Sequence, residues 1–169
     1  MRTELYWIPG PAPGRVAITP RPRGGDWLAD EIRSWRVAGI DVVVSLLTPD
    51  EVASLELADE KPLCEANGIH FVSFPIIDRS VPPSKPAVVA LTTRLANDLA
   101  DGKNIAIHCR QGIGRAGLIA ASILVQLGID PDLAIQQISV ARSCSVPETV
   151  EQRNWIMKFA SDLKSLVAK

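Results

Sequence analysis

Short apolar stretches alternate along the chain with longer segments in which apolar residues recur every three or four positions. Three of the short stretches are rich in β-branched residues, which favours strands buried on both faces of a parallel sheet. They are Ile40–Leu47, Ile69–Ile77 and Asn104–His108. The longer segments predict helices, from Trp27 to about Ala38, after Thr48, from Pro62 to Ala66, from Ser84 to about Ala100, from about Arg115 to Leu127, from Asp130 to about Arg142 and from Ser145 to about Val167.

Capping residues mark where several of these helices begin and end. Asp26 is the predicted N-cap of the first helix, and Ser84 and Asp130 occupy the same position before later ones. The segments Thr48–Glu51 and Ser145–Glu148 both have the residue types and spacing of a capping box. Glycine just past a helical pattern is a common end signal, and it is present at Gly39, Gly68 and Gly102.

The first 25 residues are rich in proline and glycine and carry two short apolar pieces, Leu5–Ile8 and Val16–Ile18. Proline is found in sheets mainly on edge strands. We therefore interpret residues 1–25 as a loop-rich segment with two edge strands.

The alternation of strands and helices predicts an α/β fold. We expect residues 1–169 to form a single domain, with a mostly parallel sheet of about four to five strands and helices on both faces. Ligands of such sheets bind where the carboxyl ends of the strands meet. Asp78 and Cys109 each follow a predicted strand directly, so we expect them at that edge.

Composition and charge narrow the classes of function. The chain is 47% apolar and 22% charged, with a net charge of −1, so no broad basic surface for nucleic acid or a membrane is expected. The three cysteines lack the spacing of a zinc site, and no leader-like or membrane-spanning stretch is visible. We expect a cytoplasmic protein without metal or cofactor, and a monomer is favoured although the oligomeric state is open.

The stretch Ile105–Gly117, IAIHCRQGIGRAG, concentrates the chemistry of the chain. A strand, a glycine-containing loop and a helix in this order direct backbone N–H groups towards an anion. Cys109 opens the loop as a candidate nucleophile, and a helix N-terminus favours the thiolate form of cysteine. Arg115 lies six positions later, where its planar guanidinium can bind two phosphate oxygens. The stretch is therefore equipped to transfer a phosphoryl group to sulfur.

The pattern His108-Cys109-x5-Arg115 resembles the signature loop of cysteine-dependent protein tyrosine and dual-specificity phosphatases. The resemblance covers most of residues 40–155 and is greatest to the small atypical dual-specificity enzymes. It is carried by VVVSLLTPDE, FPIIDRSVPP, HCRQGIGRAG and PETVEQRNW. One position departs from it: relatives usually have serine or threonine after the arginine, and this chain has Ala116. We expect the missing hydroxyl to slow hydrolysis of the phosphoenzyme.

The resemblance also implies roles for individual residues. The backbone of the loop, with Arg115, would bind the phosphate; the loop positions are Arg110, Gln111, Gly112, Ile113 and Gly114. Asp78, on a proline-containing loop, would be the general acid, with Asp101 as its nearest rival. His108 would support the loop from the opposite face of its strand. Gln152 would position water or the leaving group, and Arg142 would brace the site or serve as a helix-end charge.

The expected reaction is hydrolysis of phosphotyrosine in a protein or peptide, with phosphoserine and phosphothreonine as candidate further substrates. The principal alternative is a phosphoinositide or inositol-phosphate phosphatase, which uses the same loop but often adds lysines to it. Rhodanese-type sulfurtransferases usually have a shorter loop, and low-molecular-weight arsenate reductases place theirs near the N-terminus. A slow phosphoprotein-binding module is the alternative from outside the enzymes.

Overall fold

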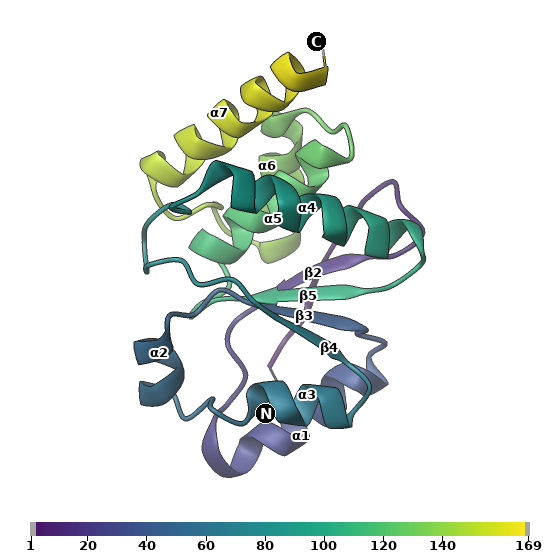
Figure 1. Ribbon diagram of the computed structural model, residues 1–169, viewed down its shortest axis with the longest axis vertical. Coiled ribbons are helices and arrows are strands. Elements are labelled where there is room, and N and C mark those ends of the chain that lie inside the picture. The colour runs from purple at the N-terminus through teal and green to yellow at the C-terminus, as the bar shows by residue number, and fades with distance from the viewer. Residues whose placement is uncertain (1–2, 168–169) are drawn as a thin grey trace.

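The computed structural model describes residues 3–167 and contains a five-stranded sheet between two layers of helices (Figure 1). The strands are β1 (Tyr6–Ile8), β2 (Val16–Thr19), β3 (Val42–Ser45), β4 (His70–Ser73) and β5 (Ile105–His108). Their order across the sheet is β1-β2-β5-β3-β4. Only the β1–β2 pair is antiparallel. The predicted α/β class and mostly parallel sheet are therefore confirmed.

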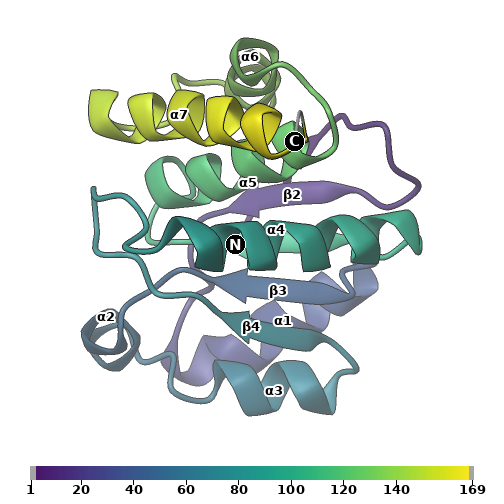
Figure 2. The ribbon, with the colours of Figure 1, turned by 45° about the horizontal axis from the view of Figure 1, so that its top comes forward.

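Helices α1 (Leu28–Val37) and α3 (Glu60–Ala66) cover one face of the sheet, and α2 (Pro49–Ser54) lies beyond its carboxyl edge. The opposite face carries α4 (Lys85–Ala100), α5 (Gly114–Gln126), α6 (Pro131–Arg142) and α7 (Val150–Val167). Figure 2 shows α4 crossing in front of the strands, with α5 and α7 beside it. Both faces of the sheet are thus shielded from water, as a parallel sheet requires.

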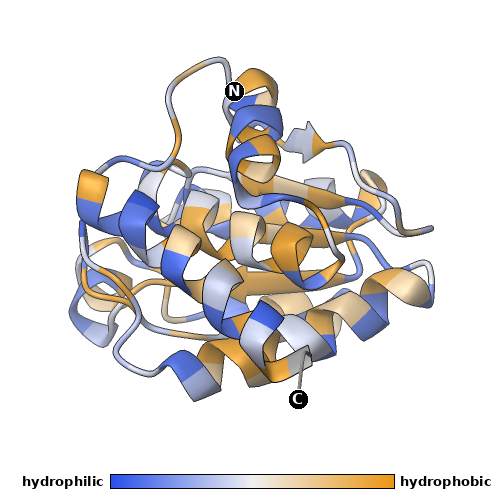
Figure 3. Ribbon diagram, turned by 90° about the horizontal axis from the view of Figure 1, so that it is seen from above, coloured by the Kyte–Doolittle hydropathy of each residue, from blue (hydrophilic) through white to orange (hydrophobic). Residues whose placement is uncertain are grey.

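Burial follows position in the sheet. Every residue of β2, β3 and β5 is buried, whereas β1 and β4, at the two edges, are partly exposed. Apolar colour accordingly concentrates along the central strands and on the inner sides of the helices (Figure 3). Side chains alternate between faces along a strand. Ile105, Ile107 and Cys109 therefore belong to the core beneath α4–α7, and Ala106 to the core beneath α1 and α3.

Three predicted element positions are wrong. Val16–Ile18 is not an edge strand, because β2 lies between β1 and β5. Asp26 does not cap α1: residues Gly25–Trp27 form a short 3-10 turn, and the α1 cap position is Trp27. Ser145 does not open the last helix, because α7 begins at Val150 with the Thr149 hydroxyl accepting from the Gln152 N–H. In each case a long-range contact overrides the local signal; for example, Val146 packs on Gly117.

The strand predicted over Ile69–Ile77 ends at Ser73. Pro75 lacks an N–H and cannot continue a regular ladder. Two isolated bonds still hold the extension to β3, from the Phe74 N–H to the Ser45 carbonyl at 2.8 Å and from the Ile76 N–H to the Leu46 carbonyl at 3.0 Å. The extension therefore carries the chain to Asp78 along a fixed path.

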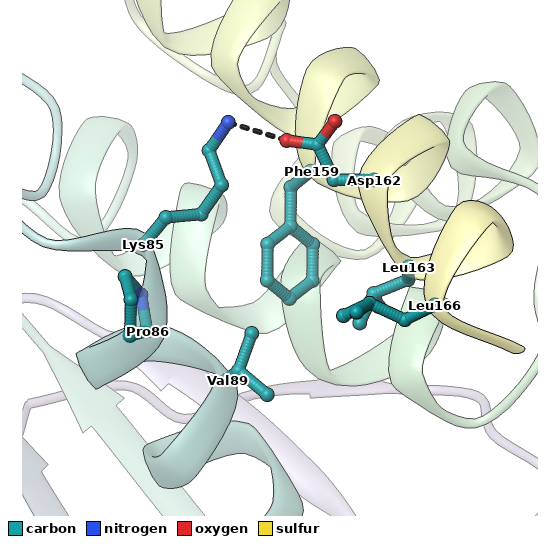
Figure 4. Close-up of a pocket in the computed structure, with 7 residues that line it drawn as sticks. All are labelled: Lys85, Pro86, Val89, Phe159, Asp162, Leu163 and Leu166. Carbon is teal, nitrogen blue, oxygen red and sulfur yellow. Dashed lines mark hydrogen bonds and ion pairs between the residues drawn. The ribbon is translucent and has the colours of Figure 1, made fainter. Parts of the chain in front are cut away.

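Helices α4 and α7 also enclose a hollow of about 320 Å³. Figure 4 shows Val89, Phe159, Leu163 and Leu166 facing it, with the ion pair between Lys85 and Asp162, 2.5 Å long, at one rim. Its lining residues all belong to α4 and α7. It is part of the packing between the two helices.

Candidate active site

The loop between β5 and α5 places Cys109 at the carboxyl edge of the sheet. Cys109 follows β5 directly, and α5 begins at Gly114. Only 4% of Cys109 is exposed, and that part lines a cavity of about 290 Å³. The lining residues are Asp78, Arg79, Cys109, Arg110, Gln111, Gly114, Arg115 and Glu148. The predicted nucleophile, arginine and general acid therefore share one cavity.

Groups outside the loop hold its carbonyl oxygens. The Arg21 N–H donates to the Arg110 carbonyl at 3.2 Å. Arg142 donates through Nε to the Gly112 carbonyl at 3.3 Å and through a terminal nitrogen to the Gln111 carbonyl at 3.2 Å. In a planar trans peptide the N–H points opposite to the C=O. The N–H groups that follow these carbonyls are thus turned to the other side, where they can bind an anion.

Gly112 is required by the backbone of this loop. Its φ of +72° is in the left-handed region, and a Cβ there would lie 2.5 Å from the Thr19 carbonyl carbon. The end of β2 therefore packs directly against the loop. Arg142, the other brace, stacks with its guanidinium carbon 4.1 Å from the centre of the Tyr6 ring. The bracing interpretation of Arg142 matches these contacts.

Arg115 is buried, and its guanidinium is fixed by protein oxygens. The two terminal nitrogens donate to the two carboxylate oxygens of Glu51 at 2.7 and 2.9 Å. One of them also donates to the Ile76 carbonyl at 2.8 Å. A guanidinium has five N–H donors, so donors are left for a phosphate. The bidentate contact holds the plane of the fork before any ligand arrives.

Glu51 is a site residue that the sequence analysis identified only as part of a capping box. It performs that capping role as well, since the Thr48 N–H donates to Glu51 Oε2 at 2.9 Å. Burial alone would raise the pKa of Glu51, but hydrogen bonds from Arg115 and Thr48 hold that pKa below its ordinary value. The same carboxylate outweighs the effect of burial on Arg115 and raises the arginine's pKa. The pair is therefore charged at neutral pH.

Asp78 lies across the cavity from the loop. Its side chain is 51% exposed, and Oδ1 is 3.0 Å from a terminal nitrogen of Arg115. The next residue, Arg79, has a φ of +61° and donates to Glu148 Oε1 at 2.6 Å. This contact joins the Asp78 loop to the segment before α7. Glu148 lines the cavity itself, and no pattern in the sequence predicted a role for it at the site.

Gln152 is buried and hydrogen bonded on both polar atoms. Its Oε1 accepts from the N–H groups of Glu148 and Thr149 at 3.2 and 3.1 Å, and its Nε2 donates to the Ser80 carbonyl at 3.0 Å. These bonds tie the segment before α7 to the Asp78 loop. Gln152 is not among the cavity-lining residues. A role for it in placing water stays a prediction, and the contacts favour a brace.

His108 points away from the cavity, as the alternation of side chains along β5 predicts. It is fully buried, with Nε2 2.6 Å from Oε1 of Glu60, the first residue of α3. Its Nδ1 is 3.3 Å from the Cys109 carbonyl oxygen. Glu60 is the third acidic residue missed from the sequence, because a pattern typical of an exposed helix start gave no sign of a buried partner.

Comparison with known proteins supports this picture at the level of the family. The family model described as "Polymorphic toxin system, DSP-PTPase phosphatase" matches residues 19–129. Cyclin-dependent kinase inhibitor 3 of Rattus norvegicus is 27% identical over 141 residues, 82% of this chain and 65% of the relative. Protein tyrosine phosphatase type IVA 3 of Bos taurus is 37% identical over 86 residues, 50% of this chain and 49% of the relative. The chain thus spans about half to two thirds of the length of these relatives.

Solved structures of phosphatases share the fold. Kinase associated phosphatase, with serine in place of its catalytic cysteine, superposes with a TM-score of 0.87 at 20% identity, covering 97% of both chains. PTPMT1 in complex with PI(5)P gives a TM-score of 0.78 at 16% identity, covering 95% of this chain and 99% of that one. The active form of Tk-PTP gives a TM-score of 0.71 at 25% identity, covering 88% of this chain and 92% of that one. These likenesses establish the architecture around the cavity.

Proposed function

The chain belongs to the DSP-PTPase phosphatase family, and from that premise we propose that it is a protein phosphatase acting on phosphotyrosine through a cysteinyl-phosphate intermediate. The observation that carries this proposal is the single cavity shared by Cys109, Arg115 and Asp78. Residues 1–169 form its catalytic domain in this proposal. The free thiols of Cys64, Cys109 and Cys144 suit a reducing compartment such as the cytoplasm.

In the proposed first step, the Cys109 sulfur attacks phosphorus and the bond to the tyrosyl oxygen breaks. The loop N–H groups and Arg115 stabilise the charge on the equatorial oxygens. Asp78 gives its proton to the leaving oxygen, so that tyrosine departs as the neutral phenol. In the second step Asp78 accepts a proton from water, water attacks phosphorus, and the Cys109 thiolate leaves. Phosphate is then released and the enzyme returns to its starting state.

The charges around the cavity favour a substrate with one phosphate. Arg79 is paired with Glu148 at 2.6 Å, and Arg110 is 3.7 Å from Glu51. The arginines at the rim therefore face carboxylates, and the cavity is also lined by Asp78 and Glu148. A second or third phosphate of an inositol ring would meet these carboxylates. A phosphoinositide is accordingly the second candidate substrate. The fold that the chain shares with PTPMT1, whose structure was solved in complex with PI(5)P, supports it.

The experiment that tests the function is phosphate release from a phosphotyrosyl peptide and from inositol phosphates, in the presence of reductant. We expect the peptide to be the better substrate. Asp78→Asn should lower kcat on the peptide by about 100-fold, because a positioned general acid contributes at least that much. Asp101→Asn, at the exposed end of α4, is the matched control and should leave kcat unchanged.

Two outcomes would contradict this assignment. Faster hydrolysis of inositol phosphates than of the peptide would transfer the same chemistry to the second substrate class. An equal effect of the Asp78 and Asp101 substitutions would remove Asp78 as the general acid.

Ala116→Ser should make the second step faster. Ala116 is buried in the first turn of α5 and belongs to the same apolar cluster as Cys109. A hydroxyl at position 116 can donate to the departing thiolate, and a hydrogen bond to a charged group is worth about 1.5 kcal/mol or more. We therefore expect about tenfold faster breakdown of the phosphoenzyme. Stopped-flow hydrolysis of an aryl phosphate measures this breakdown rate: we expect a burst of product in the wild type and a smaller burst in the variant. If Ala116→Ser left the steady-state rate unchanged, dephosphorylation would not be the rate-limiting step.

A further inference from the structure

A buried acid–histidine pair lies behind the nucleophile, on the face of the sheet opposite to the cavity. The Glu60 and His108 side chains are 2% and 0% exposed, and Glu60 Oε1 is 2.6 Å from His108 Nε2. Removing such groups from water is costly unless they are paired. The reaction steps above use neither group. The pair therefore calls for a role beyond stability.

We propose that Glu60 is a positioning residue of the reaction: through His108 it fixes the Cys109 carbonyl and with it the first N–H of the phosphate loop. The inference rests on the proposed function of that loop. Because the Cys109 carbonyl oxygen only accepts hydrogen bonds, the His108 Nδ1 facing it at 3.3 Å must carry a proton.

Glu60 can bond to Nε2 in either charge state while that proton stays on Nδ1. If the carboxylate is ionised, both ring nitrogens of His108 carry protons. If the carboxyl group is neutral, its O–H donates to Nε2 and the ring proton stays on Nδ1. Without a partner at Nε2, the proton can stay on Nδ1, but the ring loses the bond that fixes its orientation towards the carbonyl. Glu60 thus fixes the orientation of the ring, as the outer partners of functional histidines commonly do.

The consequence reaches the cavity through the peptide that joins Cys109 to Arg110. When His108 holds the Cys109 carbonyl on one side, the planar peptide turns the Arg110 N–H to the other. The carbonyls of Arg110, Gln111 and Gly112 are held by Arg21 and Arg142. The four successive carbonyls that begin at Cys109 are therefore fixed from outside the loop, and Glu60 supports the one nearest the nucleophile.

The other groups packed around His108 do not supply this control. Thr19 and Ser45, its register partners on β2 and β3, are uncharged. Trp35 of α1 is also uncharged, with its ring centre 6.1 Å from that of the imidazole. On α3, burial together with Glu60 and Glu65 raises the pKa of the Cys64 thiol to about 12, so Cys64 stays neutral. Among the residues that the structure describes, Glu60 is the acid hydrogen bonded to His108.

The test combines the protonation of His108 with the reactivity of Cys109. The chain has two histidines, so a His70→Gln background leaves one imidazole for nitrogen NMR, and Cys144→Ser leaves Cys109 as the accessible thiol. We expect a proton on His108 Nδ1 in the protein with Glu60. Glu60→Ala should weaken the Nδ1–H hydrogen bond to the carbonyl, seen as a shift of the Nδ1 resonance, slow alkylation of Cys109 by iodoacetamide, and lower kcat for a phosphotyrosyl peptide more than it changes KM. The expected loss in kcat is about 10- to 100-fold.

Glu60→Gln is the conservative variant, because its amide N–H can donate to Nε2 and keep the proton on Nδ1. It should keep the Nδ1 resonance near its wild-type position and the alkylation rate within about threefold of the wild-type value. Glu65→Ala, exposed on the same helix, is the matched control. Alkylation and NMR need no turnover, so they separate this inference from the proposed function. A bare Nδ1 in the protein with Glu60 would overturn it even if Glu60→Ala failed to fold, and so would an unchanged Nδ1 resonance and alkylation rate in a folded Glu60→Ala.

Discussion

Replacing Cys109 with serine is expected to abolish turnover, with a loss of about 10⁴-fold or more, the scale seen when a nucleophile is removed. A serine hydroxyl at neutral pH is a far weaker nucleophile than a thiolate. The cavity offers the serine no histidine to act as a base, because His108 points to the other face of the sheet. Steady-state hydrolysis of an aryl phosphate measures the loss, and mass spectrometry of acid-quenched protein detects the phosphoenzyme. We expect the phosphoenzyme in wild type and none in Cys109→Ser.

The matched control for this substitution is Cys144→Ser. Cys144 is a half-buried cysteine just after α6 and does not line the cavity. The Cys144→Ser variant should therefore retain wild-type turnover. Cys109→Ser should still bind a phosphotyrosyl peptide by calorimetry, because the loop N–H groups and Arg115 are intact. Residual turnover above a few per cent in a sample free of wild-type protein would show that another group is the nucleophile.

Arg115→Lys is expected to lower kcat/KM by about 10²- to 10³-fold, as removal of a charge-stabilising donor usually does. A lysine ammonium is a single point of charge and cannot span both oxygens of Glu51, the Ile76 carbonyl and a phosphate. The substitution leaves buried hydrogen-bond acceptors such as the Ile76 carbonyl without a donor, so the free energy of unfolding should fall by about 1–3 kcal/mol. Kinetics on an aryl phosphate and urea unfolding measure the two effects.

Arg36→Lys is the comparison for that substitution. Arg36 forms an exposed pair with Asp41, with the arginine side chain 46% exposed, and such surface pairs contribute little to stability. Both its kinetics and its unfolding should match the wild type. If Arg115→Lys also left the kinetics and the unfolding unchanged, the guanidinium held by Glu51 would have no part in the reaction.

The elements of this fold follow closely from local patterns, whereas the site depends on contacts that no local pattern contains. The strands show as β-branched runs, and the nucleophile loop combines residue types and spacing in one short stretch. Glu51 appeared in the sequence as a capping residue, and only the folded chain brings it to Arg115, 64 positions away. Glu60 and Glu148 are in the same situation. Their partners, His108 and Arg79, lie 48 and 69 positions away.

The errors have the same physical origin. Asp26 and Ser145 carry sound local signals for a helix start, but tertiary contacts use their segments differently. Gly25 donates its N–H to the Glu56 carbonyl at 3.1 Å, and the Val146 N–H donates to the Ser139 hydroxyl at 3.1 Å. Prolines flank β2 on both sides, which suggested an edge strand. The neighbours of a strand are decided by the packing of the whole sheet, and β2 lies between β1 and β5. Local propensity is a weak prior that such contacts override.

The position of β5 has a consequence for how the protein is made. β5 fills the space between β2 and β3, with Val16 and Val42 both in register with Ile105. During synthesis the first strands therefore emerge long before the strand that joins them, and two buried strand edges stay without partners in the meantime. Such edges invite association with other chains. Closing of the sheet and formation of the phosphate loop then become one late event, since the last residue to complete the sheet, His108, directly precedes Cys109.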